Sequence, residues 1–138
     1  MSSSPSNSGP SAESIAERGD IAAVPFCYVT TTGRRTGRPH TVEIWFGLRG
    51  GRLYLLSGGG DRSDWVKNIV AEPGVTVRLG GATVPGRARL VEDPDEDALA
   101  RRLLAAKYQG WSEGRPMSGW ARTALPVAID LDERLLAG

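Results

Sequence analysis

The sequence predicts a domain of the α+β class that is mainly β, a barrel or curled sheet with two or three short helices. Three observations lead to this prediction. Apolar and polar residues alternate over residues 40–48, as they do in a strand with one buried face. Glycine pairs at 50–51 and 80–81 separate short β-rich runs and favour hairpin turns. Only a few segments carry helix start and stop signals.

The composition is that of an ordinary globular domain. The chain has 138 residues, 40% apolar and 24% charged, with a formal net charge of +1. So small a charge creates no global field, so neither nucleic acid nor a membrane is an expected partner. Residues 1–11 are rich in serine and are expected to form a disordered tail, and residues 12–138 a single domain. The sequence shows no transmembrane segment or signal peptide, which favours a cytoplasmic location.

The first half is expected to form a short helix and three strands in an antiparallel meander. Residues 12–23 have a weak amphipathic pattern. Residues 24–32 are rich in β-branched and aromatic side chains, which is typical of a buried strand. Residues 40–48 form the second strand after a basic turn, and residues 53–57 return as the third.

The next segment is predicted to form a helix and a hairpin. Trp65, Ile69 and Val70 lie at helical spacing before Pro73, which ends the helix. Residues 75–79 and 82–91 are then expected to pair as strands. The dipeptide Pro85-Gly86 indicates an edge position or a bulge in the second of them.

The last segment is predicted to contain one well-capped helix and one strand. Asp93 fits the N-cap, Pro94 the first helical position, and Glu96 the third position of a capping box. Residues 109–124 are expected to be irregular, and residues 125–131 to form the final strand.

Few side chains offer chemistry of their own. The single histidine, His40, and the single cysteine, Cys27, make a protein-built metal site improbable, and no metal is expected. Cys27 lies in an apolar run and is expected to be a small buried hydrophobe. No serine has the surroundings of a nucleophile elbow, so no catalytic residue is assigned.

Two loops are candidate binding segments. The first contains TTTGRRTGRPH at residues 30–40, where three arginines offer fork-shaped donors for phosphate or carboxylate. The second is SGGGDRSD at residues 57–64, where glycines would allow close approach to amides at a helix start. An ordinary hairpin turn and an ordinary helix cap explain the same residues equally well. The residues alone leave both interpretations open.

The tryptophans favour a ligand site. Four occur in a small domain, and three of them adjoin loops, which fits the walls of a pocket for a planar aromatic ligand. A redox cofactor as that ligand would explain the missing catalytic side chains, because the cofactor would carry the chemistry.

The combination of three segments resembles a known family. They are TTTGRRTGRPHTVEIWF, RGGRLYLLSGGG and DWVKNIVAEPGVTVRLGG. Together they are similar to the deazaflavin-dependent nitroreductase and quinone reductase family, which has a split β-barrel fold related to FMN-binding proteins. The resemblance implies an oxidoreductase that transfers a hydride from reduced 8-hydroxy-5-deazaflavin, coenzyme F-420, to a quinone, enone or nitroaromatic. The coenzyme carries an anionic tail, which would account for the basic turn.

The resemblance also implies site residues. Gly58 departs from the family, because several relatives have lysine there. The residues implied to bind the cofactor are Arg34, Arg35, Thr36, Arg38, His40, Ser57, Gly58, Gly59, Trp65 and Asn68. The residues expected to line the substrate pocket are Trp45, Tyr108, Trp111 and Trp120.

Three other functions compete with this one. The same fold could bind FMN, whose phosphate would suit the same arginines. The chain could instead bind a deazaflavin or a lipid-like molecule without turnover. Nucleic-acid binding through residues 34–38 is disfavoured by the low net charge. The expected partner is a small-molecule electron acceptor, and a homodimer is the expected assembly.

Overall fold

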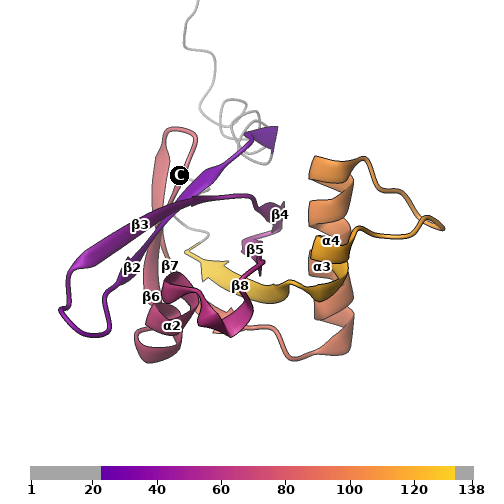
Figure 1. The fold of residues 1–138 in the computed structure, drawn as a ribbon. Coiled ribbons are helices and arrows are strands. Elements are labelled where there is room, and N and C mark those ends of the chain that lie inside the picture. The colour runs from indigo at the N-terminus through magenta and orange to yellow at the C-terminus, as the bar shows by residue number, and fades with distance from the viewer. Residues whose placement is uncertain (1–22, 133–138) are drawn as a thin grey trace, which may run out of the picture.

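Seven antiparallel strands form one curled sheet, against which the helices pack (Figure 1). The computed structural model describes residues 23–132, so the tail expected over 1–11 and nearly all of the helix expected over 12–23 lie outside the described residues. The mainly β class predicted from the sequence is confirmed. The strands are β2 (Cys27–Thr32), β3 (Pro39–Ile44), β4 (Gly47–Arg49), β5 (Arg52–Ser57), β6 (Gly74–Leu79), β7 (Ala82–Leu90) and β8 (Leu125–Leu131). The helices are η1 (Gly60–Arg62), α2 (Asp64–Ala71), α3 (Pro94–Gln109) and α4 (Gly119–Thr123).

The single strand predicted over residues 40–48 is divided into β3 and β4, so that prediction and the three-strand meander are wrong. The order in the sheet is β3-β2-β6-β7-β8-β5-β4, which places β3 and β4 at opposite edges. The alternation fails at Phe46 and Gly47, because both are buried. Three Cα–Cα steps join Ile44 to Gly47, so the two edges approach within about 11 Å. This short link therefore requires the sheet to curl into an incomplete barrel.

The predicted irregularity at Pro85-Gly86 takes a specific form. The register of β6 with β7 is continuous, so no bulge is present. β7 pairs with β8 from Gly86 onward, and Pro85 lies at the end of that pairing, where its carbonyl accepts from the amide of Asp132 at 3.1 Å. A Cβ at Gly86 would lie 2.7 Å from Ile129 Cγ2, so glycine permits the close approach of β7 to β8.

Two clusters of buried side chains form the core. The larger lies inside the curled sheet and includes Val29, Phe46 and Ile129. The smaller packs β5 and β8 against α3, which covers that end of the sheet (Figure 1). Cys27 belongs to the larger cluster, and burial raises the pKa of its thiol to about 12. The prediction that Cys27 is a buried hydrophobe is confirmed.

The helix starts follow the predicted capping only in part. Asp93 Oδ2 accepts from the amide of Glu96 at 2.9 Å, and Pro94 is the first helical residue of α3. The Glu96 side chain does not return to the cap. The segment expected to be irregular contains α4, which is capped by Ser118 through its bond from the amide of Ala121.

Glu96 instead joins a cluster of charges between α3 and the sheet. Its carboxylate accepts two bonds of 2.8 Å from Arg89, one of 3.0 Å from Arg52 and one of 2.8 Å from the Tyr54 hydroxyl. Asp130 pairs with the same two arginines, at 2.7 Å from Arg52 and 3.2 Å from Arg89. The donors lower the pKa of Glu96 to about 2, the Arg89 guanidinium contributing most. The cluster ties α3 to β5, β7 and β8.

Removal of the Glu96 charge should change the acid stability of the fold. Because the folded state lowers this pKa, the stabilisation is present above about pH 4.5 and is lost as the pH falls towards 2. Glu96→Gln should lower the free energy of unfolding at neutral pH by about 2 kcal/mol and flatten its dependence on acid pH. Urea unfolding across pH 3–7, with the exposed Glu113→Gln as control, measures both. An unchanged acid profile in Glu96→Gln would contradict the assignment.

Candidate functional site

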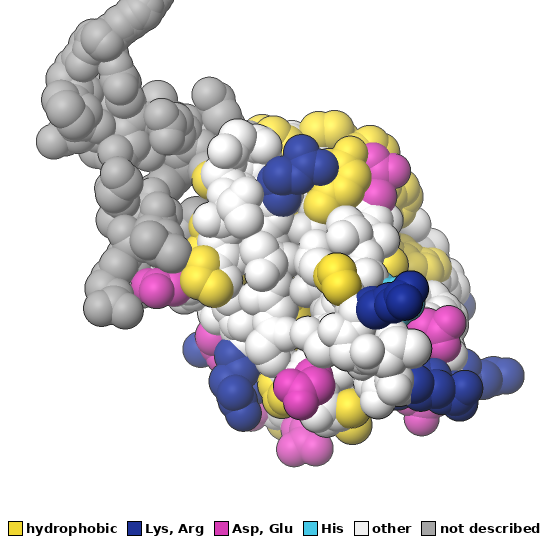
Figure 2. Space-filling view, turned by 90° about the vertical axis from the view of Figure 1, so that its left-hand side faces the viewer, with side chains coloured by type: hydrophobic (Ala, Val, Ile, Leu, Met, Phe, Trp, Pro, Cys, Tyr) yellow, Lys and Arg dark blue, Asp and Glu magenta, His cyan; other side chains and the backbone are white. Residues whose placement is uncertain are grey.

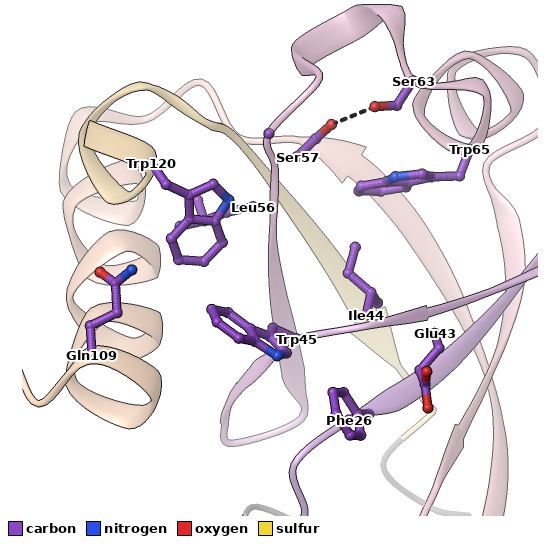
Figure 3. Close-up of a pocket in the computed structure, with 11 residues that line it drawn as sticks. Phe26, Glu43, Ile44, Trp45, Leu56, Ser57, Ser63, Trp65, Gln109 and Trp120 are labelled. Atoms are coloured by element: carbon purple, nitrogen blue, oxygen red, sulfur yellow. Dashed lines mark hydrogen bonds between the residues drawn. The ribbon is translucent and has the colours of Figure 1, made fainter. Parts of the chain in front are cut away.

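A cavity of about 560 Å³ opens between the β3–β4 link, the glycine loop after β5, the start of α2, and the helices α3 and α4. Figure 3 shows Trp45 and Trp120 on one side of it and Trp65 on the other. Its size lies in the range of small-molecule sites. Aromatic side chains make up much of its wall. The lining residues are Phe26, Glu43, Ile44, Trp45, Leu56, Ser57, Gly58, Ser63, Trp65, Gln109 and Trp120.

Ring contacts fix the position of Trp45 in that wall. Its indole stacks on the Tyr108 ring, with centroids 4.4 Å apart and planes 2° from parallel. It also meets Trp120 edge to face at 5.4 Å and 89°. Such offset and T-shaped pairs are the favoured arrangements of aromatic rings. Trp45 is therefore a preformed wall rather than a loose surface side chain.

Tyr108 supports this wall from behind and is not among the residues that line the cavity. Its hydroxyl accepts from the amide of Phe46 at 3.0 Å and lies within donating distance of the carbonyls of Pro25 and Phe46. Lys107 donates to the Phe46 carbonyl at 3.3 Å, and its Nζ lies 3.5 Å from the centroid of the Phe46 ring. Burial lowers the pKa of Lys107 to about 8. Together these contacts hold the β3–β4 link against α3.

Two serines organise the glycine loop. Ser57 is 2% exposed, and its hydroxyl donates to the Gly60 carbonyl at 2.9 Å. Its oxygen lies 3.0 Å from Ser63 Oγ, and because a hydroxyl carries one proton, Ser63 is the donor of that bond. The amides of Gly58 and Gly59 donate to no described residue. The loop therefore offers amide donors, whereas Ser57 has no free proton.

Asn68 connects the basic turn to α2. Its side chain is 3% exposed, and Oδ1 accepts from Arg34 twice, from the amide at 3.3 Å and from Nη1 at 2.8 Å. Nδ2 donates to Thr31 Oγ1 at 3.1 Å. Arg34 also lies 3.4 Å from Asp64 at the start of α2. The turn is thus fixed beside the helix that carries Ser63 and Trp65 near its start.

The rest of the turn is exposed. The side chains of Arg35 and Arg38 make no ion pair or hydrogen bond with any residue from 23 to 132, and Thr36 Oγ1 accepts from the amide of Arg38 at 3.3 Å. His40 is also exposed, beside Gly33. Figure 2 views the side towards which the β2–β3 hairpin projects, and its basic side chains form separate groups interspersed with acidic ones. On this side of the molecule, the positive charge of the turn does not extend into a larger basic patch.

Not all of the residues expected in the site meet there. Trp111 lines a different cavity, and its Nε1 donates to the carbonyl of Arg115 at 2.7 Å. Gly59 lines a separate depression with η1. The structure adds six lining residues: Phe26, Glu43, Ile44, Leu56, Ser63 and Gln109. Phe26 and Glu43 were missed because each belongs to an ordinary strand pattern in the sequence. The expected residues that do line the aromatic cavity are Trp45, Ser57, Gly58, Trp65 and Trp120.

Metal-binding clusters and membrane helices are both absent from the described part of the chain. Over residues 23–132, no group of three or more His, Cys, Asp or Glu side chains could hold a metal ion. No helix in that range is long and apolar enough to cross a bilayer.

Comparisons with known proteins give consistent results. The model of a family described as F420H(2)-dependent quinone reductase matches residues 11–132. A solved F420-H2 dependent reductase is 23% identical, with a TM-score of 0.58 over 78% of this chain and 94% of that one. A conserved hypothetical protein of Mycobacterium tuberculosis is 20% identical, with a TM-score of 0.66 over 85% and 79%. A FAD-binding protein of Mesorhizobium loti is 18% identical, with a TM-score of 0.59 over 86% and 88%. At these identities the structures show a shared fold, and the predicted split β-barrel is confirmed.

The bridging role of Asn68 is directly testable. Asn68→Leu should lower the free energy of unfolding by about 2 kcal/mol, because the part-buried Arg34 guanidinium and the buried Thr31 hydroxyl each lose one hydrogen-bond partner. Val70→Ala changes an exposed side chain of the same helix and serves as the control. Urea unfolding compares the variants. Equal stabilities of Asn68→Leu and Val70→Ala would show that the amide does not connect the two elements.

Proposed function

The chain belongs to the F420H(2)-dependent quinone reductase family, and on that premise we propose that it reduces a small, electron-poor acceptor such as a quinone, an enone or a nitroaromatic. Membership makes it an oxidoreductase that uses coenzyme F-420. Beyond family membership, we propose the class of acceptor and the residues that form the site. The observation that supports it is that a tryptophan-walled cavity and a basic turn, in which Arg35 and Arg38 have no partner among the described residues, both adjoin the start of α2.

The residues present fit the coenzyme. A flat deazaflavin ring suits an open cavity of about 560 Å³ between Trp45 and Trp65. The amide of Gly58, which lines this cavity, would donate to an oxygen of the ring, and the amide of Gly59 lies next to it in the same loop. The side chains of Arg35 and Arg38, unpaired among the described residues, would hold the phosphate and the acidic tail. Thr36 lies on the same exposed turn, and His40 follows it as the second residue of β3.

Arg34 has a different part in this proposal from its two neighbours. Its guanidinium is engaged by Asn68 and Asp64, so it shapes the turn and adds positive charge there. Asn68 likewise acts by holding the turn against α2. The two other arginines would make the direct contacts.

The chemistry requires little of the protein beyond binding and orientation. Reduced deazaflavin supplies a hydride as a two-electron donor when bound. The aromatic walls would place the acceptor flat against the ring and exclude water. Ser57 donates its only hydroxyl proton to Gly60, and Tyr108 lies outside the cavity. The proton that completes the reduction therefore comes from solvent in this proposal.

FMN is the second candidate cofactor. The structural similarity to a FAD-binding protein gives it support, and its phosphate would use the same arginines. Assembly as a homodimer stays a prediction.

Titration of tryptophan fluorescence tests the cofactor site. Oxidised coenzyme F-420 should quench the tryptophan fluorescence of the protein and should bind more tightly than FMN. Arg35→Ala should weaken coenzyme binding about fivefold, and added salt should reduce that difference, because the contact is an exposed charge pair. Arg87→Ala removes an exposed arginine of β7 and should change binding less than about twofold. Tighter binding of FMN, or equal effects of the two variants, would contradict the proposal.

A further inference from the structure

We propose that Glu43 selects acceptors by charge, so that the cavity takes neutral or cationic electron-poor rings and rejects anionic ones. The inference rests on the proposed reductase function for its identification of the ligand as an acceptor. Its basis is that Glu43 is the one charged side chain among the described residues that line the aromatic cavity. The charge of that lining is therefore negative.

The Glu43 carboxylate remains available to a ligand. Oε2 accepts from the Tyr28 hydroxyl at 2.9 Å, and Oε1 has no partner among the described residues. The Arg78 guanidinium lies 4.3 Å from the centroid of the Tyr28 ring but forms no ion pair with Glu43. Figure 3 shows Glu43 beside Phe26, at the edge of the cavity farthest from Ser57 and Ser63. Its charge is thus held in place by a neutral partner and is not cancelled by a salt bridge.

The aromatic wall favours the same ligands. Tryptophan faces carry negative potential, so they attract cations and electron-deficient rings. Trp45 stacks one face on the Tyr108 ring and meets Trp120 at 89°, and both indoles line the cavity. Phe26 and Trp45 are both exposed large apolar side chains. A carboxylate beside such a wall adds attraction for positive charge and repulsion for negative charge.

The basic turn does not neutralise this end of the cavity. Arg38 directly precedes β3 and Glu43 lies five residues further along the chain, so their Cα atoms are separated by about 16 Å in extended chain. This exceeds the screening length of about 8 Å at physiological salt. The two charges therefore act on different groups. The turn would attract the anionic tail of the coenzyme. The Glu43 carboxylate would attract a cationic acceptor beside it and repel an anionic one.

Three matched naphthoquinones test the inference: one neutral, one bearing a sulfonate and one bearing a trimethylammonium group. Their quenching of tryptophan fluorescence gives dissociation constants for the full chain without turnover. The wild type should bind the cation most tightly and the anion most weakly. In Glu43→Gln the ratio of the anion to the cation dissociation constant should fall about threefold to tenfold at low salt. This variant should fold normally, because the amide oxygen of the new side chain still accepts from the Tyr28 hydroxyl.

A matched control removes the same charge elsewhere. Glu92→Gln replaces an exposed glutamate that is not part of the cavity lining, so it should leave the ratio unchanged. Three results would each overturn the inference. The ratio could stay unchanged in Glu43→Gln, it could change equally in Glu92→Gln, or none of the three quinones could give saturable quenching. Reduction of the neutral quinone by reduced coenzyme F-420 is measured in parallel. Turnover without charge selection would overturn the inference and leave the proposed function standing. Charge selection without turnover would support the role of Glu43 in ligand binding and contradict the proposed function.

Discussion

The link formed by Trp45 and Phe46 determines both the curvature of the sheet and the wall of the cavity. It joins the two edge strands of a seven-stranded sheet, so the edges must meet where it crosses. Tyr108 and Lys107 hold it through the backbone of Phe46, and the Tyr108 ring holds Trp45 by stacking. Tyr108, a residue of α3 outside the cavity, therefore fixes Trp45, which would contact the ligand in the proposed complex. The same contacts that close the barrel thus preorganise the site.

A second constraint couples the two polar ends of the site. Asn68 fixes the basic turn to α2, while Ser63, next to the first residue of that helix, donates to Ser57 in the glycine loop. One helix start therefore fixes the distance between the arginines and the cavity. Such preorganisation matters for an enzyme whose side chains would bind and orient rather than react. Because the cofactor carries the chemistry, a chain with one histidine and one cysteine can be a reductase.

Local signals in the sequence were sufficient for most elements. The Asp93 cap of α3, the glycine turns and the alternation in β3 depend on neighbours a few residues away, and these were predicted correctly. The break in the strand after Ile44 was not predicted, because alternation alone cannot show that the chain passes from one edge of the sheet to the other. The ion cluster joins Glu96 to residues of β5 that lie more than forty positions away, beyond the reach of a capping motif. The roles of Tyr108 and Trp111 likewise depend on where α3 packs.

Anaerobic turnover tests most directly whether the chain reduces a small acceptor with reduced coenzyme F-420. The purified chain would be mixed with reduced coenzyme F-420 and a neutral naphthoquinone, and the return of the visible absorbance of the oxidised coenzyme would be followed. We expect a rate that is proportional to protein concentration and saturable in both reactants, and no comparable rate when reduced FMN replaces the coenzyme. Oxidation of the coenzyme no faster than without protein, across neutral quinones, enones and nitroaromatics, would contradict this expectation.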